Sequence, residues 1–143
     1  RDRRFSSVHE GACHCGAISY VYTTRKPVAE WPIRACQCSF CRGHGAVSTS
    51  DPDGTLKFTE NEAGALLRYR FGLRIRDYLL CGRCGIYIGA QMQTAKGLRG
   101  TVNLNAMRSR PDGLAGVTLM NYDGETAEQR SARTQAGWTP VRL

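Results

Sequence analysis

Apolar and polar residues alternate along several short stretches of the chain, and this pattern predicts β-strands. Residues 17–23 are rich in β-branched and aromatic side chains, and in residues 101–106 every second side chain is apolar. Similar patterns predict further strands at residues 56–58, 67–71, 74–80, 86–90 and 116–120. Turns rich in glycine and aspartate separate many of these stretches. The predicted fold class is therefore all-β, with antiparallel strands and little helix.

Two stretches carry more specific expectations. Leu67, Tyr69 and Phe71 alternate with arginines, which predicts a half-buried strand with its apolar side facing the core. Residues 126–135 have the only helical composition, but their faces are almost wholly polar, so we expect a surface turn or a frayed helix.

The length of 143 residues suits one domain. No linker, repeat or low-complexity tract divides it, and we assign residues 1–10 to an N-terminal arm and residues 11–143 to a single domain. No apolar run approaches the roughly 20 residues needed to cross a membrane. We therefore expect a soluble protein without a membrane partner.

Seven cysteines fall into three clusters, with none left over. The clusters are Cys13 and Cys15, then Cys36, Cys38 and Cys41, then Cys81 and Cys84. Thiolates in such short spacings favour zinc. Disulfides are disfavoured because the count is odd and C-x-C pairs are too close for an easy bridge, and we recognise no signal peptide. Reduced cysteines predict a reducing compartment, by default the cytoplasm.

The natural division is four cysteines for one zinc and three for another. Cys81 and Cys84, with Gly82 and Gly85, have the pattern of a zinc knuckle. Paired with Cys13 and Cys15, they would close a structural site of four thiolates. A zinc held only by Cys36, Cys38 and Cys41 would keep one position for water or substrate, as catalytic zinc sites do.

Two alternatives remain open at this stage. One zinc could take four of the cysteines and leave the others idle. Otherwise His44, which follows Cys41 with C-x2-H spacing, could close the central site as its fourth ligand. Gly43 and Gly45 predict a flexible segment around His44.

The net charge of +8 favours anionic partners, and the chain has only three lysines, so most of the positive charge is arginine. Arg68, Arg70, Arg74 and Arg76 alternate and could share one face of a hairpin. Without exposed aromatic residues between them, a solvated strand face explains them better than a nucleic-acid site.

In order along the chain, these motifs resemble the glutathione-dependent formaldehyde-activating enzyme (GFA) family. The resemblance rests on residues 11–18, on Cys36-Gln37-Cys38-Ser39-Phe40-Cys41-Arg42, on residues 68–72 and on Cys81-Gly82-Arg83-Cys84-Gly85. It implies coiled antiparallel sheets with a structural zinc on the outer clusters and a catalytic zinc on the central one. Gln37 and His44 depart from the residues usual in the family.

The resemblance also implies a carbon–sulfur lyase that joins or cleaves the adduct of a thiol, such as glutathione, with an aldehyde, such as formaldehyde. Arg42 could offset the charge of the central thiolates or bind a substrate carboxylate, and His44 could line the entrance. The same chemistry on another thiol or electrophile is an alternative. A centromere protein carries this domain, so a non-catalytic zinc module that binds protein or nucleic acid is another. The sequence does not indicate the oligomeric state.

Overall fold

A computed structural model describes residues 6–142, and these are folded mainly as β-sheet, as predicted. The strands are β1 (Ser7–Ala12), β2 (Ile18–Thr24), β3 (Arg34–Cys36), β4 (Ser48–Thr49), β5 (Thr55–Glu60), β6 (Leu66–Tyr69), β7 (Asp77–Cys81), β8 (Tyr87–Thr94), β9 (Gly97–Asn103), β10 (Thr118–Met120) and β11 (Thr139–Arg142). The helices are α1 (Ser39–His44) and α2 (Ala127–Gly137), with 3-10 turns at Val28–Glu30 and Leu104–Ala106.

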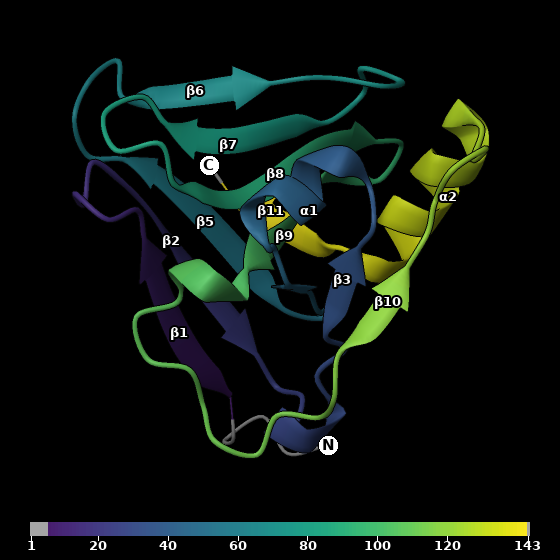
Figure 1. Ribbon diagram of the computed structural model, residues 1–143. Coiled ribbons are helices and arrows are strands. Elements are labelled where there is room, and N and C mark those ends of the chain that lie inside the picture. Colours follow the sequence, from purple (N-terminus) through teal and green to yellow (C-terminus); the bar gives the residue numbers. More distant parts are fainter. Residues whose placement is uncertain (1–5, 143) are drawn as a thin grey trace.

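The strands form one branched sheet system in the order β1-β2-β5-β11-β9-β4-β3-β10. The branch is at β9, which also pairs with β8, and β8 continues through β7 to β6. In Figure 1 the β6–β8 layer lies above the β1–β2–β5 arm, with α1 in front and α2 at one side next to β10. This branching coils the sheets around the centre of the molecule.

Two strand pairs are parallel, which differs from the antiparallel expectation. β10 pairs in parallel with β3, and β11 pairs in parallel with β5. A parallel pair needs a long crossover connection, and in both pairs the partners lie more than 80 residues apart in the chain. The alternation of apolar and polar residues within a strand does not indicate whether the strand pairs in parallel or antiparallel.

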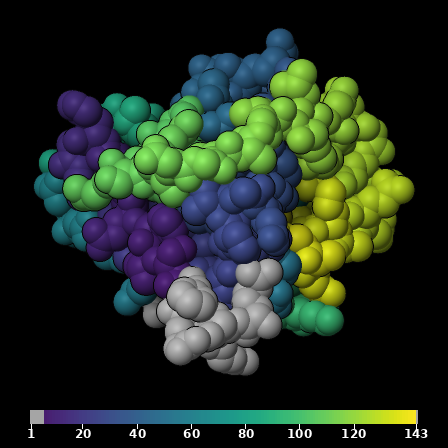
Figure 2. Space-filling view, turned by 90° about the horizontal axis from the view of Figure 1, so that it is seen from below, coloured from purple at the N-terminus to yellow at the C-terminus, as the bar shows by residue number. Residues whose placement is uncertain are grey.

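The boundary predicted for an N-terminal arm does not match the structure. Residues 7–10 lie within β1, which pairs along its whole length with β2, from Ser7 opposite Thr24 to Ala12 opposite Ser19. The rest of the predicted arm, residues 1–5, lies outside the described part. A segment after β9 runs along the edge of β1, where Met107 forms a β-bridge with Gly11 and the Arg108 N–H donates to the carbonyl of Glu10 at 2.8 Å. Figure 2 shows the green segment that follows β9 running over the purple and blue parts of the chain.

The buried side chains form two clusters. One is centred on Ile18, Tyr20, Trp31 and Leu56. The other contains Cys41, Tyr78, Tyr87, Ala90, Met92 and Trp138. The second cluster lies directly against the central cysteines, so the packing of the core and the geometry of the site are linked.

The apolar side of β6 is not buried as predicted. Leu67 and Tyr69 are 51% and 50% exposed. Among the described strands β6 pairs with β7 alone, so it lies at an edge of the sheet. Tyr69 instead packs its ring on Phe40, with centroids 5.8 Å apart.

Both helices have defined ends. Gly45, at φ 58°, ends α1 in the left-handed conformation that glycine favours, and its N–H donates to the carbonyls of Arg42 and Cys41. The segment around His44 is therefore helical rather than a flexible exit. Thr126 and Gln129 form a reciprocal capping box at the start of α2, close to the predicted helix. No helix in residues 6–142 is long and apolar enough to cross a membrane.

Candidate metal centres and active site

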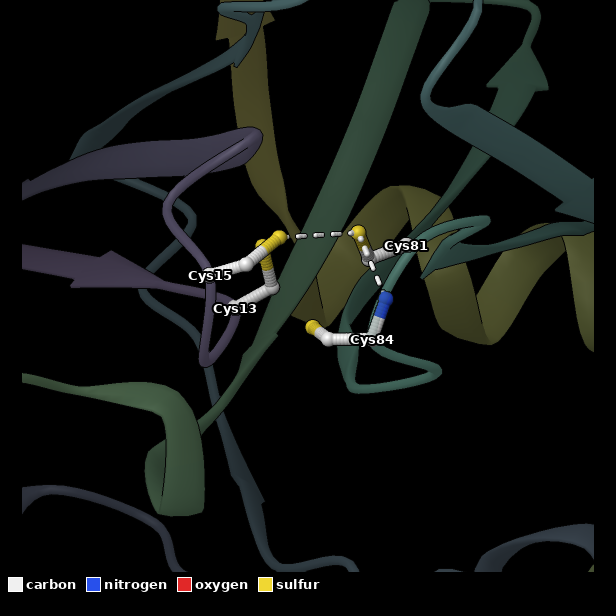
Figure 3. A group of neighbouring side chains, drawn as sticks. All are labelled: Cys13, Cys15, Cys81 and Cys84. Carbon is white, nitrogen blue, oxygen red and sulfur yellow. Dashed lines mark hydrogen bonds between the residues drawn. The ribbon is translucent and has the colours of Figure 1, made fainter.

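Four cysteines from distant parts of the chain meet at one point. Cys13 and Cys15 lie in the loop between β1 and β2, Cys81 ends β7, and Cys84 lies in the turn between β7 and β8. Figure 3 shows their side chains directed toward one another from these two hairpins. All four sulfurs lie within 4.8 Å of one another, so this four-cysteine group could hold a metal ion.

The sulfur spacing fits zinc. Zn–S bonds of about 2.3 Å in a tetrahedron place sulfurs about 3.8 Å apart. The Cys13 and Cys15 sulfurs are 3.7 Å apart, and those of Cys15 and Cys81 are 3.6 Å apart. A disulfide needs about 2.05 Å between the sulfurs, and all seven cysteines are free.

Backbone N–H groups are directed at these sulfurs. Ile18 donates to Cys13 at 3.4 Å, while Arg83 and Cys84 donate to Cys81 at 3.3 and 3.4 Å. Gly85, at φ 82°, makes the tight turn that brings these amides under the metal position. Burial acts to raise the pKa of Cys84, but hydrogen bonds from the backbone of Ile86 and Cys15 and from the neighbouring thiols lower it to about 6. Cys84 thus favours thiolate, the form that binds zinc. The backbone of Ala17 acts to lower the pKa of Cys15, but burial and hydrogen bonds with Cys81, Cys13 and Cys84 raise it to about 12, so Cys15 keeps its proton until a metal binds.

The other three cysteines form a second group at the start of α1. Cys36 ends β3, Cys38 is the N-cap of α1, and Cys41 lies in its first turn. The Cys38 sulfur accepts the Cys41 N–H at 3.4 Å, so one short turn directs all three sulfurs to one point. They lie within 4.8 Å of one another and could hold a metal ion. We call Cys36, Cys38 and Cys41 the three-cysteine group.

Two thiols of the three-cysteine group have pKa values shifted in opposite directions. A hydrogen bond from the Cys41 thiol lowers the pKa of Cys36 to about 5, although burial acts in the opposite direction. The same hydrogen bond, together with burial, raises the pKa of Cys41. At neutral pH the group therefore already holds a thiolate before any metal binds.

Two residues that the sequence associated with this group lie beside it. His44 is exposed on the last turn of α1, its ring packs on Phe40 at 4.6 Å between centroids, and it is not part of the set of close donor atoms. Arg42 is also exposed, and its Nε donates to the carbonyl of Gln37 at 3.0 Å. Arg42 thus stabilises the loop that carries the cysteines.

A cavity of about 410 Å³, part of it open to solvent, adjoins Cys36 and Cys41. We call it the inner cavity. Its other walls are mostly polar or aromatic and come from several elements: Arg34, Ser48, Arg76, Tyr78, Tyr87, Ala90, Thr101, Tyr122, Arg133 and Trp138. Burial raises the pKa of both Tyr78 and Tyr87, so their phenols stay protonated at neutral pH.

A second, wider hollow of about 1110 Å³ adjoins Cys38 on the outer side. We call it the outer groove. Gln37, Arg42 and Phe71 line one side of it, and residues 122–126 with Arg130 line the other. The three-cysteine group therefore lies between two hollows of different size.

Sequence reasoning missed most of the inner cavity. Arg34 and Cys36 share one side of β3 because they are two residues apart, and this spacing was the available signal. The four alternating arginines do not share a hairpin face as expected. Arg68 and Arg70 form ion pairs with Asp77, at 3.6 and 2.7 Å, whereas Arg76 is only 7% exposed and faces the cavity. Arg74 lies in a turn at φ 59°.

Comparison with known proteins agrees with this fold and this set of cysteines. The family described as glutathione-dependent formaldehyde-activating enzyme matches residues 8–115, and the chain belongs to this GFA family. The crystal structure of a Rhodobacter sphaeroides protein is similar at 31% sequence identity, with a TM-score of 0.58. That similarity covers 78% of this chain and 99% of the other. No curated protein matches the sequence.

Proposed function

We propose that both cysteine groups bind zinc and that the protein is a carbon–sulfur lyase, which joins a thiol to an aldehyde or cleaves their adduct. One observation carries this proposal. The four-cysteine group offers the full set of ligands of a structural zinc, whereas the three-cysteine group has no fourth histidine, cysteine or carboxylate donor among residues 6–142. Membership of the GFA family supports glutathione and formaldehyde as the first substrates to test.

The donor set of the three-cysteine group suits zinc. When bound there, zinc would supply a position at which a thiol ionises near neutral pH. The N-cap hydrogen bond of Cys38 and the packing of Cys41 in the core hold the three sulfurs in place. Little reorganisation is then needed when metal or substrate binds.

The chain's own residues provide for the rest of the reaction. The thiolate sulfur adds to the carbonyl carbon, the carbon–oxygen π pair moves to oxygen, and the thiol proton is transferred to that oxygen. Tyr78 and Tyr87 line the cavity beside Cys36 and Cys41, and their protonated phenols can donate hydrogen bonds to the developing alkoxide. In reverse, the same groups support cleavage of the carbon–sulfur bond.

The test follows adduct formation and decay by NMR with glutathione and formaldehyde, against the spontaneous rate. The zinc-loaded protein should accelerate both directions equally, and Cys38→Ser should not. X-ray absorption at the zinc edge should show one sulfur ligand more at the central site after a thiol is added. A closed site that includes an imidazole and does not respond to thiol, together with no acceleration, would leave a non-catalytic zinc module as the function.

A further inference from the structure

The inner cavity contains a buried cation that forms no ion pair with a carboxylate of residues 6–142. Arg76 is only 7% exposed, and its guanidinium carbon lies 4.2 Å from the centroid of the Trp138 ring. One of its terminal nitrogens donates to the Thr134 hydroxyl at 2.7 Å, but its buried Nε has no acceptor. A buried guanidinium is costly unless an anion and hydrogen bonds compensate it.

A second arginine lines the same cavity. Arg34 donates to the Ser50 hydroxyl, which in turn donates to the carbonyl of Gly137 at 2.7 Å. Within residues 6–142, no carboxylate lies at ion-pair distance from either side chain.

The acidic side chains Glu125 and Asp51 already accept hydrogen bonds from other residues. Glu125 accepts from both Arg130 and Arg133, at 2.9 and 2.7 Å. Asp51 accepts from the Thr24 hydroxyl and from the Asp53 N–H. Three thiolates with one zinc ion would carry a single negative charge. Three arginines line the inner cavity, Arg34, Arg76 and Arg133, and Glu125 is shared between Arg133 and Arg130 outside it, so positive charge remains for a bound anion.

The two hollows differ in the substrate they suit. The outer groove is more than twice as large as the inner cavity and is open on the Cys38 side, which suits a peptide-sized thiol. The inner cavity is small, lies against Cys36 and Cys41, and is lined by buried Arg76 and half-buried Arg34. Formaldehyde has no charge that would require such arginines.

We propose that the inner cavity binds a small aldehyde that carries a carboxylate on the neighbouring carbon, an oxo acid of the glyoxylate type. Arg34 and Arg76 would hold the carboxylate, and the carbonyl carbon would face the three-cysteine group. The thiol sulfur forms the new bond to that carbon, and the thiol proton goes to the former carbonyl oxygen, which gives a hydroxy thioether acid. This proposal rests on the proposed lyase function and specifies its electrophile.

Part of the cavity wall comes from residues outside the family match, which supports a substrate specificity particular to this chain. Tyr122, Arg133 and Trp138 lie beyond residue 115, where the family match ends. Trp138 positions Arg76, and Glu125 holds Arg133 in the cavity wall. The cavity is therefore assembled from the family core and a segment outside the family match.

The first experiment measures binding without turnover. The zinc-loaded protein, without thiol, is titrated by calorimetry with glyoxylate and with the uncharged glycolaldehyde. We expect glyoxylate to bind and Arg76→Gln to weaken its binding at least about tenfold, the effect of losing one charge-assisted contact. Arg70→Gln is the matched control, since Arg70 is an exposed arginine of the same segment, and it should leave binding unchanged. Arg34→Gln provides a second variant if Arg76→Gln does not fold.

The second experiment identifies which substrate brings the carboxylate. With 2-mercaptoethanol as the thiol, kcat/KM should favour glyoxylate over glycolaldehyde, and Arg76→Gln should lower the ratio of the two kcat/KM values at least about tenfold. If formaldehyde with mercaptoacetate depends on Arg76 and glyoxylate does not, the carboxylate belongs to the thiol and the proposal is overturned.

The two experiments separate failure of this proposal from failure of the lyase function. Binding of glyoxylate that depends on Arg76, without any turnover, would reject the lyase function and leave the carboxylate site. Turnover of formaldehyde without binding of glyoxylate would reject the carboxylate site and leave the lyase function.

Discussion

At the scale of single residues, Cys38 belongs both to a candidate metal site and to the start of a helix. Its sulfur accepts the N–H of Cys41 and so caps α1. Serine is among the best N-cap residues, so Cys38→Ser keeps the cap while it replaces a zinc ligand. This substitution can therefore separate loss of metal from loss of structure.

We predict that Cys38→Ser gives a folded, inactive protein with one zinc per chain. Cys81→Ser should instead lower the free energy of unfolding by more than about 4 kcal/mol, since loss of a structural metal is among the largest single-residue effects. Thermal melts and metal analysis of the two variants provide the measurement. Equal melts would contradict the separate roles of the two groups.

His44→Ala tests the closed-site alternative. The exposed ring packs on Phe40 and lies outside the cysteine set, so zinc should stay at two per chain and stability should fall by no more than about 1 kcal/mol. The rate or its pH dependence should change if His44 assists proton transfer at the entrance. A drop to one zinc would mean that His44 is a ligand.

The residues that could be predicted are those whose chemistry lies in local spacing. The three-cysteine group follows from its C-x-C-x2-C pattern, because one turn of backbone fixes the sulfur positions, whereas the pairing of the two outer clusters was predicted from the division of seven cysteines into four and three. The burial of Arg76 and the pairing of Arg68 with Asp77 depend on how the strands pack in the folded protein. An alternating run of arginines does not indicate which of them will be buried and which will be exposed.

At the scale of elements, α2 is held by charges as well as by its cap. Glu125, just before the helix, accepts hydrogen bonds from Arg130 and Arg133, and the Arg133 guanidinium lies 3.5 Å from the Tyr122 ring centroid. The sequence predicted this helix as frayed because its residues are polar. Thr134 is nevertheless fully buried, because polar contacts rather than an apolar stripe dock α2.

The pH dependence of this contact can be predicted. The hydrogen bond from Arg133 lowers the pKa of Glu125 from 4.5 to about 2, although partial burial opposes the shift. A carboxyl with a lowered pKa in the folded state stabilises the fold above its ordinary pKa, and this stability is lost as the pH falls toward the lowered value. Glu125→Gln should therefore be less stable than wild type at pH 7, with the difference closing between about pH 4.5 and pH 2.

Denaturant unfolding across this pH range provides the measurement. Subtraction of wild type and variant removes the loss of zinc at low pH, which both proteins share. Asp123→Asn, an exposed carboxyl in the same loop, is the control and should show a much smaller difference. A constant gap at all pH values would mean that the charge of Glu125 does not stabilise the fold.

At the scale of the whole molecule, the four-cysteine group joins the β1–β2 hairpin to the β7–β8 hairpin, segments nearly seventy residues apart. The three-cysteine group lies within six residues of one segment and joins nothing distant. Chelator titration should therefore show two phases, with the central zinc lost first and the far-ultraviolet circular dichroism largely kept until the second phase. One concerted phase with unfolding would contradict this order.

The position of β11 has a consequence for synthesis of the chain. β11 lies in the interior of the sheet, between β5 and β9, with Val141 opposite Leu56 and Thr139 opposite Gly100. While the chain is being translated, one edge of β5 and the part of β9 at Arg99 and Gly100 stay unpaired until residues 139–142 leave the ribosome. A nascent chain that stalls before this point presents two open strand edges, which are templates for aggregation and for capture by chaperones.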